Sequence, residues 1–399
     1  MKRIGWWALA PVALLLSCGE EEYSYLNSVE FRPDIRDVVE CDFEPTADGW
    51  ERYSCLPIFS AKDGLAQGWE SSGIGDFDII QREIFGAPFY QMWYSGQSPS
   101  GDEEIGYAVS MDATNWNRHP FNPVVRQGDS ARSFDRDSAS VACIAFDGEL
   151  GRYHLWYTGT NSEASGTTFG HATSADGVVW LKDLQNPLDP FDGIDSSESI
   201  SRVWGCDALF EDGQFHLWVG GVTRPEGITT LDDFLEFTHY DIGYMSTTDG
   251  INFEVDPVPV LSHAEHAGTQ FDAEGVHKPS VFTFGQGGEG IDKYWMLYAG
   301  YQEVIATDDP SSSLIFINQE GESLGMASSA LPGSGWSKLS DEPVPLDIDI
   351  TETLDSPRAF FINGRLHVFF TDSFEDTETG DTFTGIGLGI APFPAVEAQ

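Results

Sequence analysis

The sequence predicts an all-β fold built from one repeated unit of short antiparallel strands. Apolar residues alternate with small or polar ones at a period of two, as in residues 90–96 (YQMWYSG), and Gly, Asn and Pro separate the runs. The unit then returns along the chain, with successive starts roughly 60 to 80 residues apart. Five copies of a four-strand unit predict a five-bladed β-propeller.

Each repeat has two halves. The first half is a strand of the type Tyr-x-x-Trp-Tyr-x-Gly, whose copies begin at residues 90, 153, 215, 294 and 366. The second half, residues 105–125 in the first copy, contains Ile-Gly-Tyr-Ala, a Ser-x-Asp turn, a Trp and Asn-Pro-Val. We expect the Trp of the first half in the blade core and the Asp of the second half in a turn. Since one repeat family runs from about residue 45 to the end, it predicts a single domain over residues 45–399.

The N-terminal arm carries the strand that the last repeat lacks. Trp50 precedes Pro57 by the same spacing that separates Trp116 from Pro123, whereas the last repeat stops at Pro392 with no Trp or Asn-Pro after it. We therefore expect the arm to complete the last blade and close the ring, which removes the open edges of the sheets.

Loop lengths assign the expected site to one face. Turns between the first and second strands of a repeat are short, with one exception, whereas the loops between strands two and three and the links between repeats are long. In an up-and-down blade, the loops between strands two and three and the links between blades emerge on the same face. Binding or chemistry is therefore expected there, at the mouth of the central channel.

The charge balance limits the partners. The formal net charge is −45, from 65 acidic and 20 basic residues, so phosphate backbones are repelled and no nucleic-acid partner is expected. One interpretation of the negative charge is a solvated surface. Calcium binding is the other interpretation, and a central calcium ion stays open, although no Asp-x-Asp-x-Asp-Gly loop supports it. No other cofactor or metal site is predicted, and we expect a monomer.

Residues 1–17 predict a cleaved signal. A basic start precedes an apolar run too short to span a membrane, and the run ends Leu-Leu-Ser-Cys at Cys18. This end resembles a bacterial lipobox, which implies cleavage before Cys18 and acylation of its thiol. The alternative is an ordinary secretory signal with a chance Cys. With the lipobox, residues 18–44 form a tether and the protein is lipid-anchored in the bacterial cell envelope without spanning the membrane.

The other four cysteines fall into two pairs. Cys41 and Cys55 lie close together in an exported chain, which predicts a disulfide that holds the N-terminal arm. Cys143 and Cys206 lie in the first strands of neighbouring repeats. They either pair or remain buried thiols.

Residues at the start of each innermost strand are expected to face a shared pocket. Aligning the repeats by their Trp-Tyr-x-Gly strands selects one residue from each: Asp76, Asp137, Asp207, His277 and Asp355. Such a set suits glycoside hydrolysis, where one carboxylate activates water or attacks the anomeric carbon and one carboxylic acid protonates the leaving oxygen. Trp69, Trp204 and Arg358 are further candidates for sugar binding. The structural alternatives are carboxylates that hydrogen-bond the strand starts and a core histidine.

The repeat signature resembles a known group. Trp-Tyr-x-Gly, Ile-Gly-Tyr-Ala-x-Ser-x-Asp-Gly-x-x-Trp and Asn-Pro-Val are similar to the motifs of the five-bladed propeller glycosidases, the arabinanase, levansucrase and invertase superfamily with glycoside hydrolase families 43 and 32. The resemblance covers nearly the whole chain after the signal. It implies that Asp76 is the nucleophile or base, and that Asp137, in Arg136-Asp137-Ser138, stabilises the transition state.

The general acid of that superfamily has no counterpart here. Its Glu would fall at Gly205 in one motif and, before Gly-Pro, in the stretch His277-Lys278-Pro279 in another, which leaves Glu274 or Asp207 as substitutes. Two hypotheses follow. The protein is either an exported glycosidase that acts on an oligo- or polysaccharide in a central pocket, or a non-catalytic glycan-binding or scaffold lipoprotein that has lost the acid.

Overall fold

The computed structural model of the protein describes part of the chain, and the strands, contacts and distances below belong to that part. The described residues are 41–46, 49–62, 68–162, 167–190, 200–223, 239–263, 271–273, 275–284, 292–301, 303–306, 317–320, 323–344, 355–375, 380 and 382–391. All of them lie within the compact unit Asp37–Gln399. The signal, the lipobox cysteine Cys18 and most of the expected tether lie outside them.

The described residues form an all-β protein in which the first four repeats each give a unit of antiparallel strands. The first unit is β4 (Gly73–Ile84), β5 (Ala87–Gln97), β6 (Glu103–Ser110) and β7 (Asn117–Arg118). The second is β8 (Ser138–Asp147), β9 (Arg152–Thr160), β10 (Thr167–Ser174) and β11 (Trp180–Lys182). The third is β12 (Ile200–Glu211), β13 (Gln214–Thr223), β14 (His239–Thr247) and β15 (Glu254–Val255). The fourth is β16 (Gly275–Thr283), β17 (Tyr294–Tyr301), β20 (Ser323–Ser329) and β21 (Ser337–Lys338), with a hairpin of β18 (Glu303–Ala306) and β19 (Ile317–Glu320) between β17 and β20.

The last unit takes its outer strands from the N-terminal arm. Strands β22 (Asp355–Ile362), β23 (Arg365–Glu375) and β24 (Thr382–Ala391) pair in order. Then β2 (Glu51–Tyr53) pairs antiparallel with β24, β1 (Phe43–Pro45) pairs with β2, and β3 (Phe59–Ser60) also pairs with β24. The arm therefore adds to the last repeat the strand that the sequence predicts.

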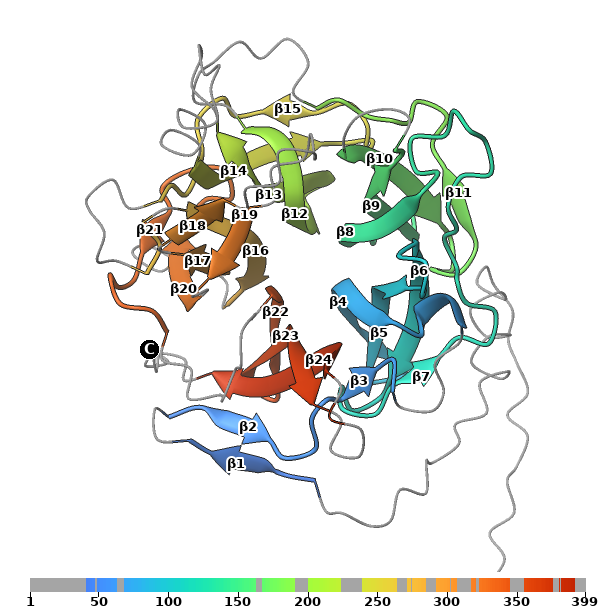
Figure 1. The fold of residues 1–399 in the computed structure, drawn as a ribbon. Coiled ribbons are helices and arrows are strands. Elements are labelled where there is room, and N and C mark those ends of the chain that lie inside the picture. The colour runs from blue at the N-terminus through green and yellow to red at the C-terminus, as the bar shows by residue number, and fades with distance from the viewer. Residues whose placement is uncertain are drawn as a thin grey trace, which may run out of the picture. The chain divides into compact units, whose positions relative to one another are not determined.

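The first strands of the units meet one another. Contacts run from β4 to β8, β8 to β12, β12 to β16, β16 to β22 and β22 to β4. In Figure 1 these five strands lie nearest the middle of the view, with the other strands of each unit outside them. Side chains on the first strands of different repeats are thus brought together, although they are far apart in the sequence.

Tryptophans of the first half-repeat join neighbouring units. Trp93, Trp156 and Trp218 are fully buried, as expected for core residues. Each indole N–H donates to a carbonyl in a turn of the following unit: Gly177 at 2.8 Å, Gly250 at 2.9 Å and Pro332 at 2.9 Å. Burying one such side chain contributes roughly 1.5–3 kcal/mol, and its satisfied N–H avoids the cost of a buried polar group.

The predicted turn residues have the expected role. The Asp112 carboxylate accepts the backbone N–H groups of Thr114 at 2.9 Å and Asn115 at 2.8 Å. Asp249 accepts those of Ile251 and Asn252 in the same way. These carboxylates accept hydrogen bonds from backbone donors in a tight turn, and this structural role explains the Asp residues without a catalytic one.

Both cysteine pairs form disulfides. The Cys41–Cys55 bond is confirmed. Cys143 and Cys206, for which the sequence left two outcomes, are also bonded to each other across a separation of 63 residues. That bond connects β8 to β12, the first strands of two neighbouring units. Among the described residues, no helix is long and apolar enough to cross a membrane.

Candidate functional site

Every first strand carries a register shift in its first half. The register shifts lie between Ile74 and Phe77, Val141 and Cys143, Val203 and Cys206, His277 and Ser280, and Asp355 and Arg358. Four residues lie inside these shifts, each two places before the residue that pairs with Trp93, Trp218, Leu297 or Phe369: Asp76, Gly205, Lys278 and Ser356. In β8 the shift skips Ala142 instead, and Ser140 keeps its partner Thr158. We call Asp76, Gly205, Lys278 and Ser356 the bulge residues. Bulges re-aim side chains and are common beside active sites.

Three bulge residues from three units meet. The hydroxyl of Ser356 donates to Oδ1 of Asp76, and Nζ of Lys278 lies 3.5 Å from the same oxygen and 3.4 Å from Oγ of Ser356. The side chain of Asp76 is 42% exposed, whereas that of Lys278 is 14% exposed. The partly exposed carboxylate of Asp76 is thus held by the ammonium of Lys278 and the buried hydroxyl of Ser356.

The backbone at these positions is strained. Lys278 and Ser356 both have a φ of 49°, in the left-handed region, and Gly205 has a φ of 133°. A left-handed conformation costs a non-glycine residue roughly 1–2 kcal/mol. Strain of this kind persists only where the surroundings enforce it, and it concentrates at functional sites.

A second carboxyl group, Glu103, lies beside Asp76, and the sequence did not indicate it. Its side chain comes from the start of β6 and accepts a hydrogen bond from the hydroxyl of Ser140 in β8. Burial raises the pKa of Glu103 above its ordinary value, the Ser140 hydrogen bond opposes that rise, and the negative charge of Asp76 adds to it. Two carboxyl groups in unlike environments are the usual basis of acid and base roles.

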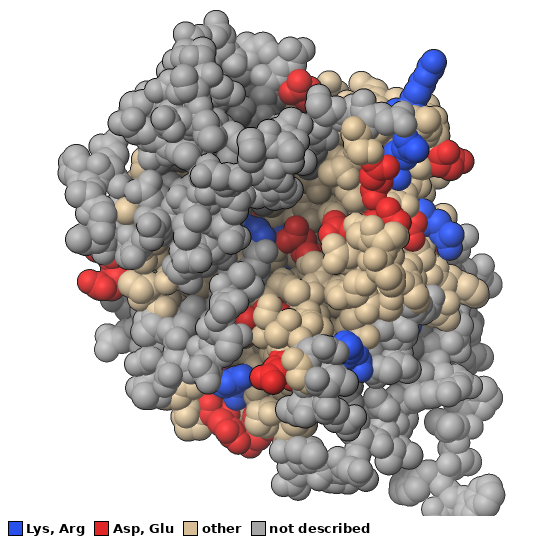
Figure 2. Space-filling model, viewed as in Figure 1, with Lys and Arg blue, Asp and Glu red and all other residues tan. Residues whose placement is uncertain are grey.

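The charges are visible on the surface. Figure 2 shows acidic and basic side chains near the middle of the face in view, where the first strands of Figure 1 converge. Among the described residues, no group of three or more His, Cys, Asp or Glu side chains could hold a metal ion. The described part of the chain therefore gives no support to a central calcium ion.

Arg358 lies one layer deeper and is not available to a sugar. It is 6% exposed, and its Nε donates to Oδ1 of Asp78 in β4 at 3.0 Å. Its other nitrogens donate to backbone carbonyls of the remaining first strands, at 2.9 to 3.4 Å: Ala142, Cys206, Pro279 and Pro357. One guanidinium thus contacts all five first strands. The sequence-based expectation of a sugar-binding Arg358 is wrong, because its donors are directed at the protein.

Asp207 also belongs to this deeper layer. It pairs across its sheet with Trp218, as Asp78 pairs with Trp93. The predicted alignment of Asp207 with Asp76 is therefore wrong by two residues, and the residue of β12 that corresponds to Asp76 is Gly205.

The Asp207 carboxylate is fully engaged. It accepts the backbone N–H of Ala208 at 2.7 Å and that of Val281, in the next unit, at 2.5 Å. Burial raises the pKa of Asp207 to about 7, the charge of Asp78 adds to the rise, and Arg358 opposes it. The group lies below the bulge residues and links two units, so we do not assign it a catalytic role.

His277 and Asp355 are displaced from the predicted ring by one residue. They precede the bulge residues Lys278 and Ser356 in their strands. His277 is buried, with its ring 6.1 Å from that of Tyr240. The side chain of Asp355 lies outside the described residues, as do Glu274 and the side chain of Trp204.

Asp137 lies before β8 and is not a bulge residue. Its Oδ2 accepts the backbone N–H of Ser162 at 2.5 Å, and its Oδ1 lies 3.9 Å from Nε of Arg136. The Ser162 hydrogen bonds lower the pKa of Asp137, and the charge of Arg136 adds to this. Asp137 is 35% exposed and ionised, as a group that contacts a sugar would be. Its hydrogen bond to Ser162 also connects the ends of two loops, which is a structural role.

Trp69 packs inside the first unit. Its ring lies 5.8 Å from that of Tyr94, and a Cβ added at Gly96 or Gly106 would collide with it at 2.4 and 2.7 Å. Phe134 fills the same place over two glycines of the second unit. The glycines of the repeat signature therefore make room for an aromatic wedge, and Trp69 is that wedge rather than a sugar-stacking platform.

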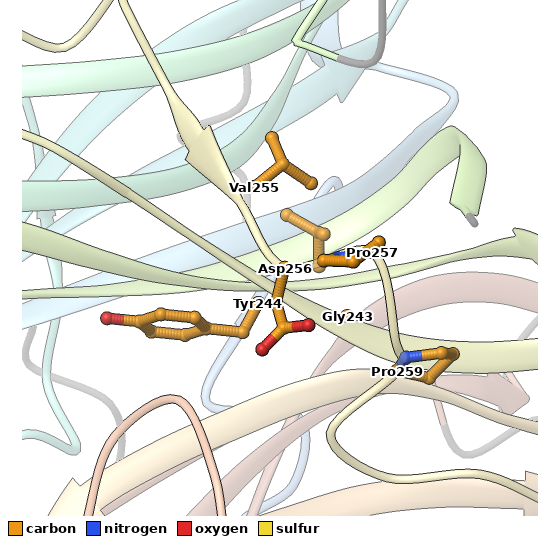
Figure 3. A pocket seen from close by; sticks show the side chains of 7 residues that line it. Gly243, Tyr244, Val255, Asp256, Pro257 and Pro259 are labelled. Atoms are coloured by element: carbon orange, nitrogen blue, oxygen red, sulfur yellow. The ribbon is translucent and has the colours of Figure 1, made fainter. Parts of the chain in front are cut away.

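A small cavity lies away from the bulge residues. It has a volume of about 10 Å³, enough for one water molecule, and Figure 3 shows Tyr244, Asp256 and two prolines around it, at the outer side of the third unit. It is too small to hold a sugar.

No protein-family model and no curated protein sequence matches the chain. Solved structures share its fold. A glycoside hydrolase aligns with a TM-score of 0.55 and 14% identity over 82% of this chain and 89% of the other. A structure described with the GH130 family of mannoside phosphorylases, which contains glycoside hydrolases that target β-1,2 mannosidic linkages in Candida mannan, gives 0.54 and 16% over 85% and 93%. A sucrose-6-phosphate hydrolase from Lactobacillus gasseri gives 0.53 and 12% over 82% and 61%. The chain thus has the fold of the propeller-type glycoside hydrolases that its repeat signature resembles.

Proposed function

We propose that the protein is an exported glycoside hydrolase, a closed five-bladed propeller that takes an oligo- or polysaccharide where its first strands converge. The observation that carries the proposal is the half-exposed carboxylate of Asp76, held by Lys278 and Ser356 at bulges that recur in every unit. The pairing of β2 with β24 and the contact of β22 with β4 support the closed ring.

Asp76 is the base or nucleophile in this proposal. Lys278 and Ser356 fix one of its oxygens and leave the other to face a water molecule or an anomeric carbon. Glu103 is the acid. It is protonated over a wider pH range than an ordinary Glu because burial and the charge of Asp76 raise its pKa, and protonation lets it donate to the leaving oxygen. Asp137 stays a candidate for sugar positioning at the edge of the site.

The second candidate is a glycan-binding protein without turnover, and one observation favours it. Gly205 and the stretch His277-Lys278-Pro279 stand where the resembled superfamily has its acid motifs, without a Glu, and the ammonium of Lys278 lies against the proposed base. A paired carboxylate is a weaker base, since the cation favours the ionised form. Such a protein would bind a glycan at the same residues and leave it intact.

The two candidates are separated by turnover on a panel of aryl glycosides and plant and microbial polysaccharides. If the enzyme proposal is right, Asp76→Asn and Glu103→Gln each lower kcat by about 100-fold or more, the usual effect of removing an acid or base. Glu342→Gln, an exposed carboxylate far along the chain, is the control and keeps full activity.

The pH profile tests the role of Glu103 directly. Because the acid must be protonated, activity falls as pH rises through the raised pKa of Glu103, and this limb disappears in Glu103→Gln while residual activity persists. Turnover that survives Asp76→Asn would contradict the site. Binding without turnover, lost in Lys278→Met, would favour the second candidate.

We also propose that the chain is anchored by lipid on Cys18, on the basis of the lipobox-like Leu-Leu-Ser-Cys. Growth with a labelled fatty acid is expected to label the wild-type chain and not Cys18→Ala. Equal labelling, or none in either, would contradict the anchor.

A further inference from the structure

Three units contain a buried ion pair that the proposed reaction does not use. In each, a carboxylate from the segment before the first strand meets a cation from the fourth strand, and the carboxylate side chains are 0 to 4% exposed. The N–O distance is 3.0 Å in the first unit and 2.6 Å in the fourth. We call these pairs the anchors: Glu70 with Arg118, Asp135 with Lys182, and Asp272 with Lys338.

A tyrosine of the second strand lies against each anchor. The hydroxyl of Tyr298 donates to Asp272 at 3.1 Å, and that of Tyr157 donates to the acid of the second unit at the same distance. Burial raises the pKa of Tyr94 in the first unit, and the charge of the acid there adds to the rise. Each buried carboxylate therefore has a cation and a neutral hydroxyl beside it, as a buried charge requires.

The acid of each anchor also packs on the glycine at the end of the second-strand motif. A Cβ added at Gly96, Gly159 or Gly300 would lie 2.6 to 2.7 Å from the Cβ of that acid. The segment that carries the acid is thus already in contact with the sheet and has no room to move toward it. Because the cation holds the same segment by its charge, the anchor fixes where the first strand starts.

The anchors occur in the units that supply charged residues to the candidate site. The first, second and fourth units each have a tyrosine, a cation two residues after the fourth-strand Trp, and an acid before the first strand. These units contribute, in that order, Asp76, Asp137 and Lys278.

The other two units depart from this arrangement. The third has Val219 at the place of the tyrosine and Val255 at the place of the cation, and both line the small cavity of about 10 Å³. The fifth has Phe370 at the place of the tyrosine. Their bulge residues, Gly205 and Ser356, carry no charge. The anchors thus accompany the charged members of the site.

The anchor of the fourth unit lies a short way along the chain from Lys278. Asp272 precedes Lys278 by six residues, the spacing that also separates the acid of the first unit from Asp76. Between the anchor and the register shift, β16 pairs with β17 only over Gly275–His277. Lys278 lies inside the shift, where the ladder is disrupted, with a φ of 49°. Its direction therefore depends on how the strand enters the bulge.

We propose that Asp272 and Lys338 are positioning residues, which fix the start of β16 so that the ammonium of Lys278 meets Asp76. They contact no substrate and act through Lys278. The inference rests on the proposed function for what Lys278 does, but not for where its side chain lies. Loss of the anchor is expected to release the ammonium, which is 14% exposed in the intact site, toward solvent.

The test is limited acetylation of lysines with acetic anhydride, followed by mass spectrometry of the peptide that contains Lys278. The exposed Lys62 is the internal reference. In Lys338→Met we expect the labelling rate of Lys278, relative to Lys62, to rise by about threefold, the size of effect that loss of a partly exposed ion pair produces. This measurement needs neither a substrate nor turnover.

Lys182→Met is the matched control, because it removes the cation of the equivalent anchor in the second unit. Both variants lose the same kind of contact, so a shared loss of stability cannot explain a difference between them. Lys278 is expected to react at the wild-type rate in Lys182→Met. It is also expected to do so in Lys338→Arg, since Arg118 fills the corresponding place in the first unit. A wild-type rate in Lys338→Met, or an equal rise in Lys182→Met, would overturn the proposal.

A smaller change serves if Lys338→Met does not fold. Tyr298→Phe removes one hydroxyl from the anchor and keeps its charges, and Tyr157→Phe is the equivalent change in the second unit. We expect faster labelling of Lys278 in Tyr298→Phe only. Equal rates in the two variants would contradict the role of the anchor.

Kinetics add a second measurement if the protein has turnover. Because the anchor acts through Lys278, the double variant with Lys278→Met and Lys338→Met is expected to have the kcat/KM of Lys278→Met alone. Losses that add would show a structural role independent of Lys278 and contradict the proposal. If no substrate is turned over, the enzyme proposal fails, and the labelling of Lys278 still decides this one.

Discussion

Two layers of the same five strands have opposite properties. The bulge residues, Asp76 among them, include a carboxylate that reaches solvent and strained backbone at Lys278 and Ser356. Two residues further along, Asp78, Asp207 and Arg358 are buried, and their polar atoms are directed at the protein. The layers contain the same kinds of residue. The difference lies in whether water and a ligand can reach them, and it is why the proposed function assigns chemistry to the bulge residues and a role in holding the units together to the deeper layer.

The largest expected loss of stability follows a substitution in the deeper layer, which Asp78, Asp207 and Arg358 form. Arg358→Met removes the cation that faces Asp78 and Asp207 and leaves carbonyls of four strands without their donor. Breaking a buried ion pair by removing one partner costs about 3–5 kcal/mol. We expect a loss of that size in the free energy of unfolding, measured by urea denaturation.

Lys278→Met is the matched change in the bulge layer. It removes one cation next to one half-exposed carboxylate, so we expect a loss of about 1 kcal/mol or less. If both substitutions cost the same, the distinction between the layers is wrong.

The next effect concerns how stability depends on pH. Because burial raises the pKa of Asp207 to about 7, the folded protein keeps a proton that the unfolded chain releases near its ordinary value of 3.8. This contribution to stability is therefore present at pH 4 and is lost as pH rises toward 7. Asp207→Asn is expected to remove this loss of stability between these values, whatever its effect on absolute stability.

His154 and His171 act in the opposite direction over the same range. Their rings lie 3.1 Å apart and burial lowers the pKa of each to about 4, so wild type also loses stability as pH falls from 6.5 toward 4. The Asp207 effect is therefore read as the difference between variant and wild type at each pH. An unchanged difference from pH 4 to 7 would contradict a protonated Asp207.

The smallest expected effect is that of Ser356→Ala. The hydroxyl donates to Asp76, so its loss weakens the hold on one carboxylate oxygen and leaves Lys278 in place. We expect kcat to fall by about tenfold, or about 1.4 kcal/mol, close to the lower end of the roughly 1.5–3 kcal/mol that one hydrogen bond to a charged group contributes, with little change in Tm. A fall as large as that of Asp76→Asn would mean that the serine reacts itself.

Much of the fold could be predicted because its signals are local. Alternation at a period of two gives the strands, and the Asp residues of the turns bind backbone a few residues away. The equal spacing of Trp50–Pro57 and Trp116–Pro123 identified the arm as a missing strand, and β2 pairs with β24 accordingly. The close pair Cys41 and Cys55 was likewise predicted.

The site was less predictable because it depends on register. A bulge adds a residue to one strand without changing the repeat motif on its neighbour, so aligning by Trp-Tyr-x-Gly placed Asp207, His277 and Asp355 one or two residues away from Asp76. A shift of one residue exchanges the faces of a strand. Glu103 was missed because it belongs to another strand, and only its closeness to Asp76 in the folded protein makes it a candidate.

The sequence by itself determined the repeated unit, its strands and turns, the strand supplied by the arm and the presence of a carboxylate at Asp76, because each rests on contacts between chain neighbours or on spacing. Only the tertiary structure decided which residues share a layer, that Cys143 pairs with Cys206, and that Arg358 serves the protein instead of a ligand. Those outcomes depend on distances between strands up to 280 residues apart, such as the one that carries Asp76 and the one that carries Ser356, and such distances exist only once the units have packed.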